Sequence, residues 1–305
     1  MRIFVAGATG AIGRRAIPLL LQAGHSVTGI ARSREKRLQL ERQGAVAVEA
    51  DVFDRDNIRD TVAGHDAVLN LATHIPTGTR AMLPWAWLEN DRVRRYGAAN
   101  LVDGAIATGA HLFIQESFAP VYPDSGDKWI DETVPIQPVR YSMAVKHAES
   151  AAERFATHGG RAIILRFGFF YGSDSGFTVD MINSVRRGMA PSFRPEGFIS
   201  SVSHDDAASA VAAVLDAPRG VYNVVDDEPV RRREMFDIIA GELGVKPPRF
   251  LPSIVARLMG SLGETLSRSQ RISNAKLRAA TNWKPAYPSA REGLAQAIRE
   301  RATSA

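Results

Sequence analysis

Short apolar runs alternate with helical stretches along the first half of the chain. The apolar runs lie at residues 1–6, 26–31, 45–50, 67–72, 111–115 and 162–166, and another follows at 221–225. Helical patterns occupy residues 14–22, 34–43, 57–62, 88–109 and 141–157. Strands that alternate with helices are typical of an α/β fold built on a doubly wound parallel sheet. We therefore predict that fold class.

The organisation changes from about Gly172. Helices then alternate irregularly with short strands, and prolines and glycines become frequent, as at Pro247-Pro248 and Pro252. We predict a doubly wound domain over residues 1–171 and a smaller, mostly helical part over residues 172–305, with the chain passing between them. Ligands of such sheets bind outside the carboxyl ends of the strands, so the second part is expected to cover the substrate there.

A glycine-rich turn follows the first predicted strand directly. Its sequence is Gly7-Ala-Thr-Gly10-Ala-Ile-Gly13, and a helix comes next. One glycine makes the tight turn, one admits a pyrophosphate to backbone N–H groups, and one lets the helix pack on the strand. A turn without a ligand is the alternative, but strand, turn and helix in this order predict a Rossmann dinucleotide site. The expected contacts are Gly7, Thr9, Gly10, Ala11, Ile12 and Gly13.

The end of the second predicted strand indicates which dinucleotide binds. It reads Ile30-Ala31-Arg32-Ser33 and carries no carboxylate. An acid there would hold the ribose hydroxyls of NAD, whereas an arginine takes the 2′-phosphate of NADP. We predict NADP over NAD, with Arg14 and Arg15 available to assist.

Further cofactor contacts are expected where the third and fourth strands end. These residues are Asp51, Val52, Leu71, Ala72 and Thr73. Asp51 could instead be the N-cap of the following short helix.

With these motifs the chain resembles an atypical extended short-chain dehydrogenase/reductase of the NAD(P)-dependent epimerase/dehydratase superfamily. The resemblance runs from Met1 to about Leu294 and includes the glycine turn, residues 51–52, 70–72, 116–122, 166–172, 203–207 and 283–287. It implies a catalytic tyrosine, a lysine four residues later and a Ser or Thr hydroxyl.

The tyrosine position of this set falls on Tyr141. Val145 stands four residues later, and the nearest lysine is Lys146, which a five-residue step turns away on a helix. The hydroxyl position falls on Phe118, with Ser117 beside it. We take Tyr141, Ser117 and Lys146 as the catalytic candidates.

Candidate substrate residues lie on loops expected to face the cleft. They are His74, Tyr171, Arg194 and His204. His204 could instead be a packed or capping residue, and Asp205 an N-cap. Trp85 and Trp87 are expected to form a lid or pocket wall, or to be partly buried in the core.

We predict an NADP-dependent oxidoreductase or epimerase that acts on a polar small molecule, such as a sugar nucleotide or a natural-product ketone or alcohol, with Tyr141 as acid and base. The alternatives are an NADP-binding sensor or regulator and a non-redox isomerase, because the lysine and hydroxyl positions are altered.

Composition excludes several other classes. There are 38 basic and 33 acidic residues, giving a net charge of +5, but no basic stripe with aromatics, so no nucleic acid is expected. Residues 231–233, all arginine, are interpreted as a solvated surface. No apolar stretch approaches about 20 residues, which predicts a cytoplasmic protein without a membrane segment. No metal site is expected, and the resemblance implies a possible homodimer through residues 88–109 and 141–157.

Overall fold

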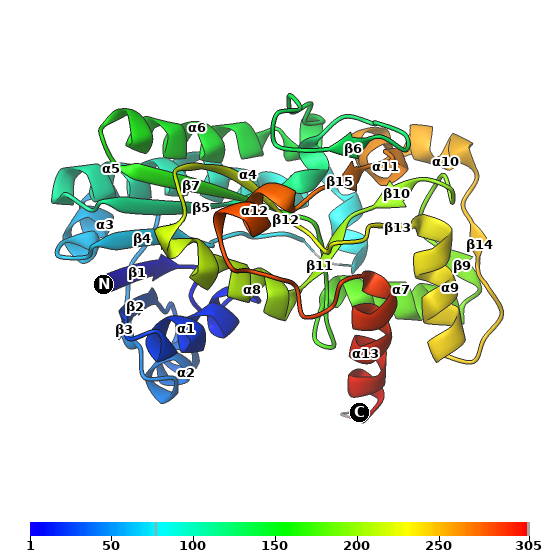
Figure 1. Ribbon diagram of the computed structural model, residues 1–305, viewed down its shortest axis with the longest axis horizontal. Helices are drawn as coiled ribbons and strands as arrows, with labels where there is room; N and C mark the ends of the chain where they lie inside the picture. Colours follow the sequence, from blue (N-terminus) through cyan, green and yellow to red (C-terminus); the bar gives the residue numbers. More distant parts are fainter. Residues whose placement is uncertain (77, 304–305) are drawn as a thin grey trace.

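A seven-stranded parallel sheet forms the centre of the protein, in the strand order β12-β7-β5-β4-β1-β2-β3 (Figure 1). The computed structural model describes residues 1–76 and 78–303. The strands are β1 (Arg2–Ala6), β2 (Ser26–Ile30), β3 (Val46–Val48), β4 (Ala67–Asn70), β5 (Leu112–Phe118), β7 (Arg161–Phe167) and β12 (Gly220–Val224). The predicted doubly wound α/β sheet is confirmed.

Helices cover both faces of the sheet. One face carries α1 (Gly13–Gln22), α2 (Arg34–Arg42) and α8 (His204–Ala213), and the other carries α3 (Arg55–Val62), α5 (Ala98–Thr108) and α6 (Ala144–Thr157) (Figure 1). Successive side chains of β1 therefore enter different cores: Ile3 and Val5 pack under α1, and Phe4 packs under α3 and α5. Burial on both faces explains why the strands are continuous apolar runs.

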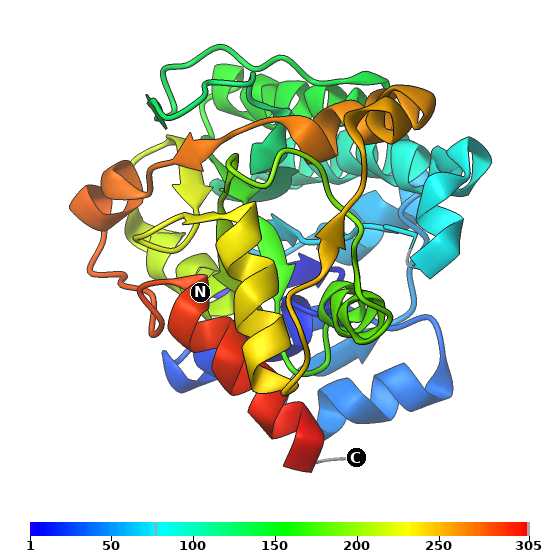
Figure 2. The same cartoon turned by 90° about the vertical axis from the view of Figure 1, so that its right-hand side faces the viewer.

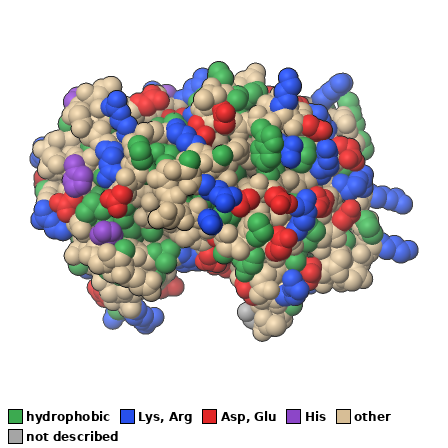
Figure 3. All heavy atoms as spheres, viewed as in Figure 1, with side chains coloured by type: hydrophobic (Ala, Val, Ile, Leu, Met, Phe, Trp, Pro, Cys, Tyr) green, Lys and Arg blue, Asp and Glu red, His purple; other side chains and the backbone are tan. Residues whose placement is uncertain are grey.

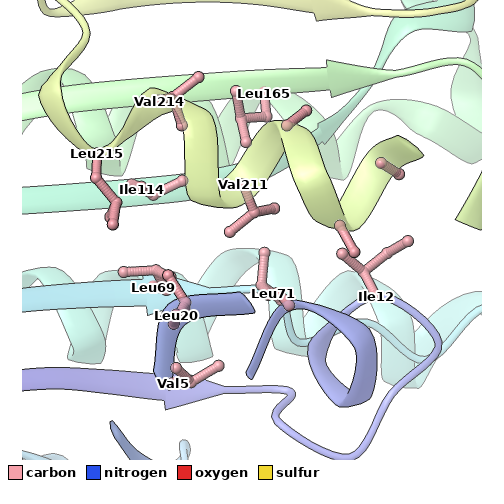
Figure 4. Packing of buried hydrophobic residues seen from close by; sticks show 14 of the residues in the cluster. Val5, Ile12, Leu20, Leu69, Leu71, Ile114, Leu165, Val211, Val214 and Leu215 are labelled. Carbon is pink, nitrogen blue, oxygen red and sulfur yellow. The ribbon is translucent and has the colours of Figure 1, made fainter. Parts of the chain in front are cut away.

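The core beneath α1 and α8 contains residues from both halves of the sequence. Val211 of α8 and Leu20 of α1 point at the sheet residues Leu69 and Leu165, and all four are fully buried (Figure 4). The chain thus returns to the sheet after residue 172, since α8 and β12 both lie in the layers of the Rossmann unit.

The remaining C-terminal segments gather beyond the carboxyl ends of the strands. There α7 (Gly176–Arg186), α9 (Arg232–Glu242) and α13 (Ala290–Thr303) enclose a small core that includes Tyr171, Phe236 and Leu294 (Figure 2). The shorter helices are α10 (Ser253–Leu258), α11 (Gly260–Ser267) and α12 (Ala275–Ala280). Four strand pairs link this region: β8 (Phe169–Tyr171) with β11 (Ser201–Ser203), β9 (Met189–Ala190) with β14 (Arg249–Phe250), β10 (Phe198–Ile199) with β13 (Val230–Arg231), and β6 (Trp129–Ile130) with β15 (Arg271–Ile272).

The long helix predicted over residues 88–109 contains a π-helical turn. It consists of α4 (Leu88–Arg92), the π-turn η3 (Val93–Gly97) and α5. A π-turn changes which side chains face inward, and such turns occur frequently at functional sites. Here the turn buries Arg94 and leaves Arg95 exposed.

One of the three arginines interpreted as solvated is buried, which corrects that interpretation. Arg232, the first residue of α9, is 2% exposed and donates a hydrogen bond to the backbone carbonyl of Arg268. Burial lowers the pKa of Arg232 to about 10. Arg231 is partly exposed and Arg233 is exposed, so the interpretation as a solvated surface holds for these two residues and fails for Arg232 alone.

Acidic and basic side chains are interspersed on the face of the molecule shown in Figure 3. Among the described helices, none combines the length and apolarity needed to cross a bilayer.

Candidate active site

The glycine turn places the start of α1 close against β1. Gly7 adopts φ +80°, and a Cβ at Gly13 would approach the Gly7 carbonyl oxygen to 2.2 Å and the Ala8 carbonyl oxygen to 2.7 Å. Only glycine allows that approach. Ile12 precedes α1 without a side-chain cap. The N–H groups of residues 14–16 already bond to carbonyl oxygens of the turn, whereas those of Ile12 and Gly13 have no acceptor in the described part of the chain and remain available to an anion.

A cavity of about 1040 Å³ runs from this turn along the carboxyl ends of the strands. Eleven of the twelve predicted cofactor residues line it, and Gly13 is excluded because it packs beneath the turn. The lining residues are Gly7, Thr9, Gly10, Ala11, Ile12, Arg32, Asp51, Val52, Leu71, Ala72 and Thr73. The cradle, its free helix N-terminus and its volume fit a dinucleotide.

The end of the cavity nearest β2 carries two basic residues. Arg32 directly follows β2, and Lys36 lies in the first turn of α2. Ser33 caps this helix by accepting a hydrogen bond from the Lys36 N–H at 3.3 Å. Sequence reasoning missed Lys36, although the sequence predicts a helix directly after Arg32 and Ser33 and thus places Lys36 in its first turn.

Asp51 stands in the same region without capping a helix. Its carboxylate accepts the Phe53 N–H at 3.0 Å, and the N-cap of α3 is Asp54. Of the two alternatives for Asp51, the capping role is therefore wrong.

Arg14 and Arg15 face away from the Arg32 end. Both pair with Asp174, and Arg15 also pairs with Asp205 at 2.7 Å. The expectation that they assist a 2′-phosphate is corrected, because these carboxylates already hold both guanidinium groups. Burial alone would raise the pKa of Asp174, but Arg15 and Arg14 outweigh it and hold that pKa below its usual value.

The loop after β4 is held by two buried amides. The Asn70 side chain accepts the Ala72 N–H at 3.2 Å, and the Asn90 side chain accepts the His74 N–H at 3.2 Å. His74 lines the cavity, as predicted for a residue near the reacting end.

Tyr141 lies on a 3₁₀ turn, η5 (Arg140–Ser142), just before α6 begins at Ala144. Its half-buried ring packs edge-on against Trp87, with the ring centroids 4.8 Å apart, and both residues line the cavity. Burial raises the pKa of Tyr141, while the Thr265 hydroxyl, Arg94 and Arg268 act in the opposite direction.

The lysine position is apolar in the structure. Val145 is 3% exposed and lines the cavity, whereas Lys146 is exposed on the outer face of α6. The Lys146 N–H bonds to the Met143 carbonyl oxygen, three residues back, so α6 begins irregularly, but Lys146 still does not line the cavity. Lys146 is thus misplaced as a catalytic candidate.

Ser117 lines the cavity, and its hydroxyl group already donates a hydrogen bond within the protein. Its Oγ donates to Glu149 Oε1 at 2.6 Å. Glu149 in turn accepts two hydrogen bonds from Arg166, at 2.8 and 2.7 Å. The Ser117 hydroxyl therefore has only its lone pairs left for a ligand, and the adjacent Phe118 also lines the cavity.

Two of the four predicted substrate residues lie elsewhere. Tyr171, the last residue of β8, is buried in the C-terminal core, whereas the two preceding residues, Phe169 and Phe170, line the cavity. Arg194 pairs with Asp124 outside the cavity. His204 does line the cavity, with Nδ1 3.2 Å from an Asp174 carboxylate oxygen.

The end of the cavity around Tyr141 is largely apolar and aromatic. Its wall is assembled from η2 (Pro84–Trp87), β8, α7 and α11, which lie far apart in the sequence. The side chains are Trp87, Phe169, Phe177, Met259, Leu262 and Leu266. Trp85, by contrast, is 66% exposed and does not belong to this wall.

A Rossmann sheet, a glycine cradle and a tyrosine on the far side of one cavity define an NAD(P)-dependent oxidoreductase or epimerase of the short-chain dehydrogenase/reductase type. Comparison with known proteins agrees: residues 7–218 match the model of the NAD(P)H-binding family, and the chain belongs to that family.

Relatives and solved structures support this assignment. The chain is 33% identical to a 3-diazoavenalumate denitrifying reductase from a Streptomyces species, over 96% of this chain and 99% of that protein. It is 25% identical to a 4-hydroxy-2-methyl-3-oxo-4-farnesyl-3,4-dihydroquinoline-1-oxide ketoreductase from Stigmatella aurantiaca, over 88% and 81% of the two chains. The fold resembles a UDP-glucose 4-epimerase from Thermotoga maritima, with a TM-score of 0.79 at 20% identity and coverage of 100% and 99%.

Proposed function

We propose that the protein is an NADP(H)-dependent reductase that converts a hydrophobic ketone or related electrophile to its reduced product, with Tyr141 as the proton donor. The observation that carries the proposal is the continuity of one cavity. The glycine turn, Arg32 with Lys36, and Tyr141 with its aromatic surroundings all line it.

The basic end of the cavity supports NADP over NAD. Arg32 and Lys36 offer two positive charges next to the end of β2, and residues 30–33 of this strand end carry no acid of the kind that holds the ribose hydroxyls of NAD. The carboxylate of Asp51, which lies in the same region, follows β3 and accepts the Phe53 N–H. A guanidinium binds a phosphate by charge-assisted, bidentate hydrogen bonds. Since the ribose hydroxyls of NAD lack that charge, the same groups give NAD no comparable contact.

The apolar end favours the ketone class over a sugar nucleotide. Aromatic and aliphatic side chains from β8, α7 and α11 form much of the wall at this end, beside the polar side chains of Asp180, Asn183 and Ser184 on α7. The apolar part of the wall offers no groups to replace the water around a sugar. One relative is named as the ketoreductase of a dihydroquinoline oxide that carries a farnesyl chain, and the other as a denitrifying reductase of 3-diazoavenalumate. The farnesyl-bearing compound of the first name suits a wall of this kind.

A reduced nicotinamide would supply hydride when bound by the glycine turn, the loop after β4 and Arg32. Tyr141 would donate its phenolic proton to the substrate oxygen as the carbonyl π electrons move onto it. The resulting phenolate would regain a proton from solvent through the cavity. Trp87 and Leu262 would exclude bulk water from the reacting carbon.

Substitution of the tyrosine tests this function. A panel of hydrophobic aldehydes and ketones is offered with NADPH, and cofactor oxidation is followed. For any compound that is reduced, Tyr141→Phe should lower kcat by about 10²–10⁴, the usual contribution of a general acid. The matched control is Tyr96→Phe, which changes an exposed tyrosine outside the cavity and should leave kcat unchanged. Equal turnover by both variants would contradict the proposal.

A further inference from the structure

A tyrosine in an apolar cavity is a poor proton donor on its own. Burial raises the pKa of Tyr141 because the phenolate left after proton transfer is costly where water is excluded. A nearby cation stabilises that phenolate. Neither Val145 nor the outward-facing Lys146 supplies one.

Arg94 is the cation that reaches this end of the cavity from the π-turn. Its side chain is 4% exposed, and its Nη2 donates to Glu116 Oε1 at 2.8 Å. Arg94, Glu116 and Tyr141 line the same cavity, and η3 packs against α6 directly after the Tyr141 turn.

The hydrogen bonds of the Arg94–Glu116 pair are incomplete. Within the described part of the chain, Arg94 Nη1 and Glu116 Oε2 are both buried without a hydrogen-bond partner. Buried charged groups seldom leave such atoms unsatisfied in a structural ion pair. The spare donor of Arg94 is therefore a specific indication that this arginine serves something other than the pair.

The second cation near Tyr141 is Arg268, and its hydrogen-bond partners differ in kind from those of Arg94. Arg268 donates from Nη1 to the carbonyl oxygens of Tyr122 and Gln137, at 2.9 and 2.7 Å, and from Nη2 to Glu264 at 2.6 Å. These bonds tie Arg268 to the loops before α6 and to α11. Arg268 is therefore a structural link, whereas Arg94 retains an unused donor.

We propose that Arg94, fixed by Glu116 on the π-turn, is the positioning residue that enables Tyr141 to donate and regain a proton, in the place where the lysine is absent. This rests on the proposed function and assigns the electrostatics of its proton donor. Arg94 does not exchange a proton itself. The surrounding charged groups are Glu116 on β5, Asp91 on α4 and Arg268 after α11.

The test measures the reactivity of the Tyr141 phenol without cofactor or substrate. The intact protein is treated with phenylmethanesulfonyl fluoride at about pH 8–9, close to the range in which tyrosines begin to ionise. Phenolates attack the sulfur and displace fluoride, and mass spectrometry follows modification of the Tyr141 peptide. Arg94→Met should slow labelling at least about tenfold, which corresponds to one pKa unit, whereas Arg94→Lys should restore most of the rate.

Arg95→Met is the matched control, since Arg95 is an exposed arginine on the same turn and should leave the rate unchanged. If Arg94→Met does not fold, Arg94→Met/Glu116→Gln removes both buried charges together, and the same slowing is expected. Labelling as fast as in the parent protein, or absence of Tyr141 labelling in the parent, would overturn the proposal.

This readout is independent of turnover. If Tyr141→Phe left reduction unchanged while Arg94→Met slowed labelling, the proposed function would fail, and only the effect of Arg94 on the ionisation of the Tyr141 phenol would stand. The reverse pattern would overturn Arg94 alone. Where a reducible compound is found, the pH profile of kcat should also shift upward in Arg94→Met and return toward the parent profile in Arg94→Lys.

Discussion

At the scale of single residues, the proposed preference for NADP over NAD rests on the two basic side chains beside β2. Arg32 presents a fork of donors and Lys36 a point charge, so the two act on a phosphate in different ways. Their contributions can be separated by substitution, because neither side chain forms part of the hydrophobic core.

Arg32→Ala should weaken NADPH binding about 10–100-fold, as expected for the loss of one or two hydrogen bonds between charged groups. NADH binding should change little, since NADH lacks the phosphate that Arg32 contacts. Fluorescence titration measures both constants. Arg34→Ala is the control, because Arg34 starts the same helix and does not line the cavity. An equal loss for both cofactors in Arg32→Ala would indicate general damage to the site.

His204 predicts a pH effect on stability. Burial, followed by the nearby Arg15, lowers the pKa of His204, although Asp174 partly opposes this. The folded state then binds fewer protons than the unfolded state, whose histidine titrates near about pH 6.5. The stability that the neutral His204 side chain contributes to the folded state is therefore present above that pH, and it is lost as the pH falls through the pKa of His204 in the folded state. His204→Gln should flatten the acid side of a urea-unfolding profile, whereas His111→Gln, at an exposed position, should not. An unchanged profile in His204→Gln would contradict this assignment.

At the scale of elements, the strand–turn–helix at the start of the chain depends on one close backbone approach. Gly13→Ala places a methyl group against the Gly7 and Ala8 carbonyl oxygens, which cannot yield as side chains do. We expect a loss of about 2–3 kcal/mol in the free energy of unfolding, as for overpacked cores, together with loss of NADPH binding. Chemical denaturation and titration measure the two effects.

Gly241→Ala is the matched control for that substitution. Gly241 also lies in a helix, α9, but a methyl group at this position would meet no other atom within 4 Å. Alanine should therefore stabilise the protein by about 0.5–1 kcal/mol there. A stable Gly13→Ala that still bound NADPH would show that the close approach is not required.

The sequence predicts elements better than it predicts their local irregularities. The strands are predictable because burial on both faces makes most of their residues apolar, as in 67–69. The π-turn at Val93–Gly97 is not predictable, since its residues fit an ordinary helix equally well. That turn buries Arg94, so the spacing of apolar residues in the sequence does not indicate that Arg94 faces the cavity.

The same contrast applies to the site. The glycine turn can be found because its spacing follows from local geometry, and Tyr141 can be found because the family resemblance implies a tyrosine at this position. The aromatic wall cannot, because Phe177 and Leu262 meet at the cavity only through tertiary packing. The prediction for Tyr171 is wrong because this last residue of β8 packs into the C-terminal core, while Phe169 and Phe170 before it line the cavity.

At the scale of the whole molecule, the C-terminal part covers the cavity while remaining joined to the sheet. α8 and β12 lie within the Rossmann layers, and Arg15 of α1 binds both Asp174 and Asp205 from the second half of the chain. The two ends of the cavity are thereby held in one framework, which fixes the distance between the glycine turn and Tyr141.

Association of two copies remains a proposal based on the resemblance. It would use the outer faces of α5 and α6, which cover one side of the sheet (Figure 1). Light scattering should then give twice the chain mass of 33.2 kDa at working concentration. The mass of a single chain would contradict it.

The central claim is that this cavity binds NADP(H) across its full length, and a paired titration of NADPH and NADH tests it most directly. Quenching of tryptophan fluorescence reports binding, since Trp87 lines the cavity. The account predicts that NADPH binds at least about tenfold more tightly than NADH, the discrimination expected for a single phosphate held by charged donors. Equal affinities, or tighter binding of NADH, would contradict the assignment of Arg32 and Lys36 and with it the NADP dependence proposed for the enzyme.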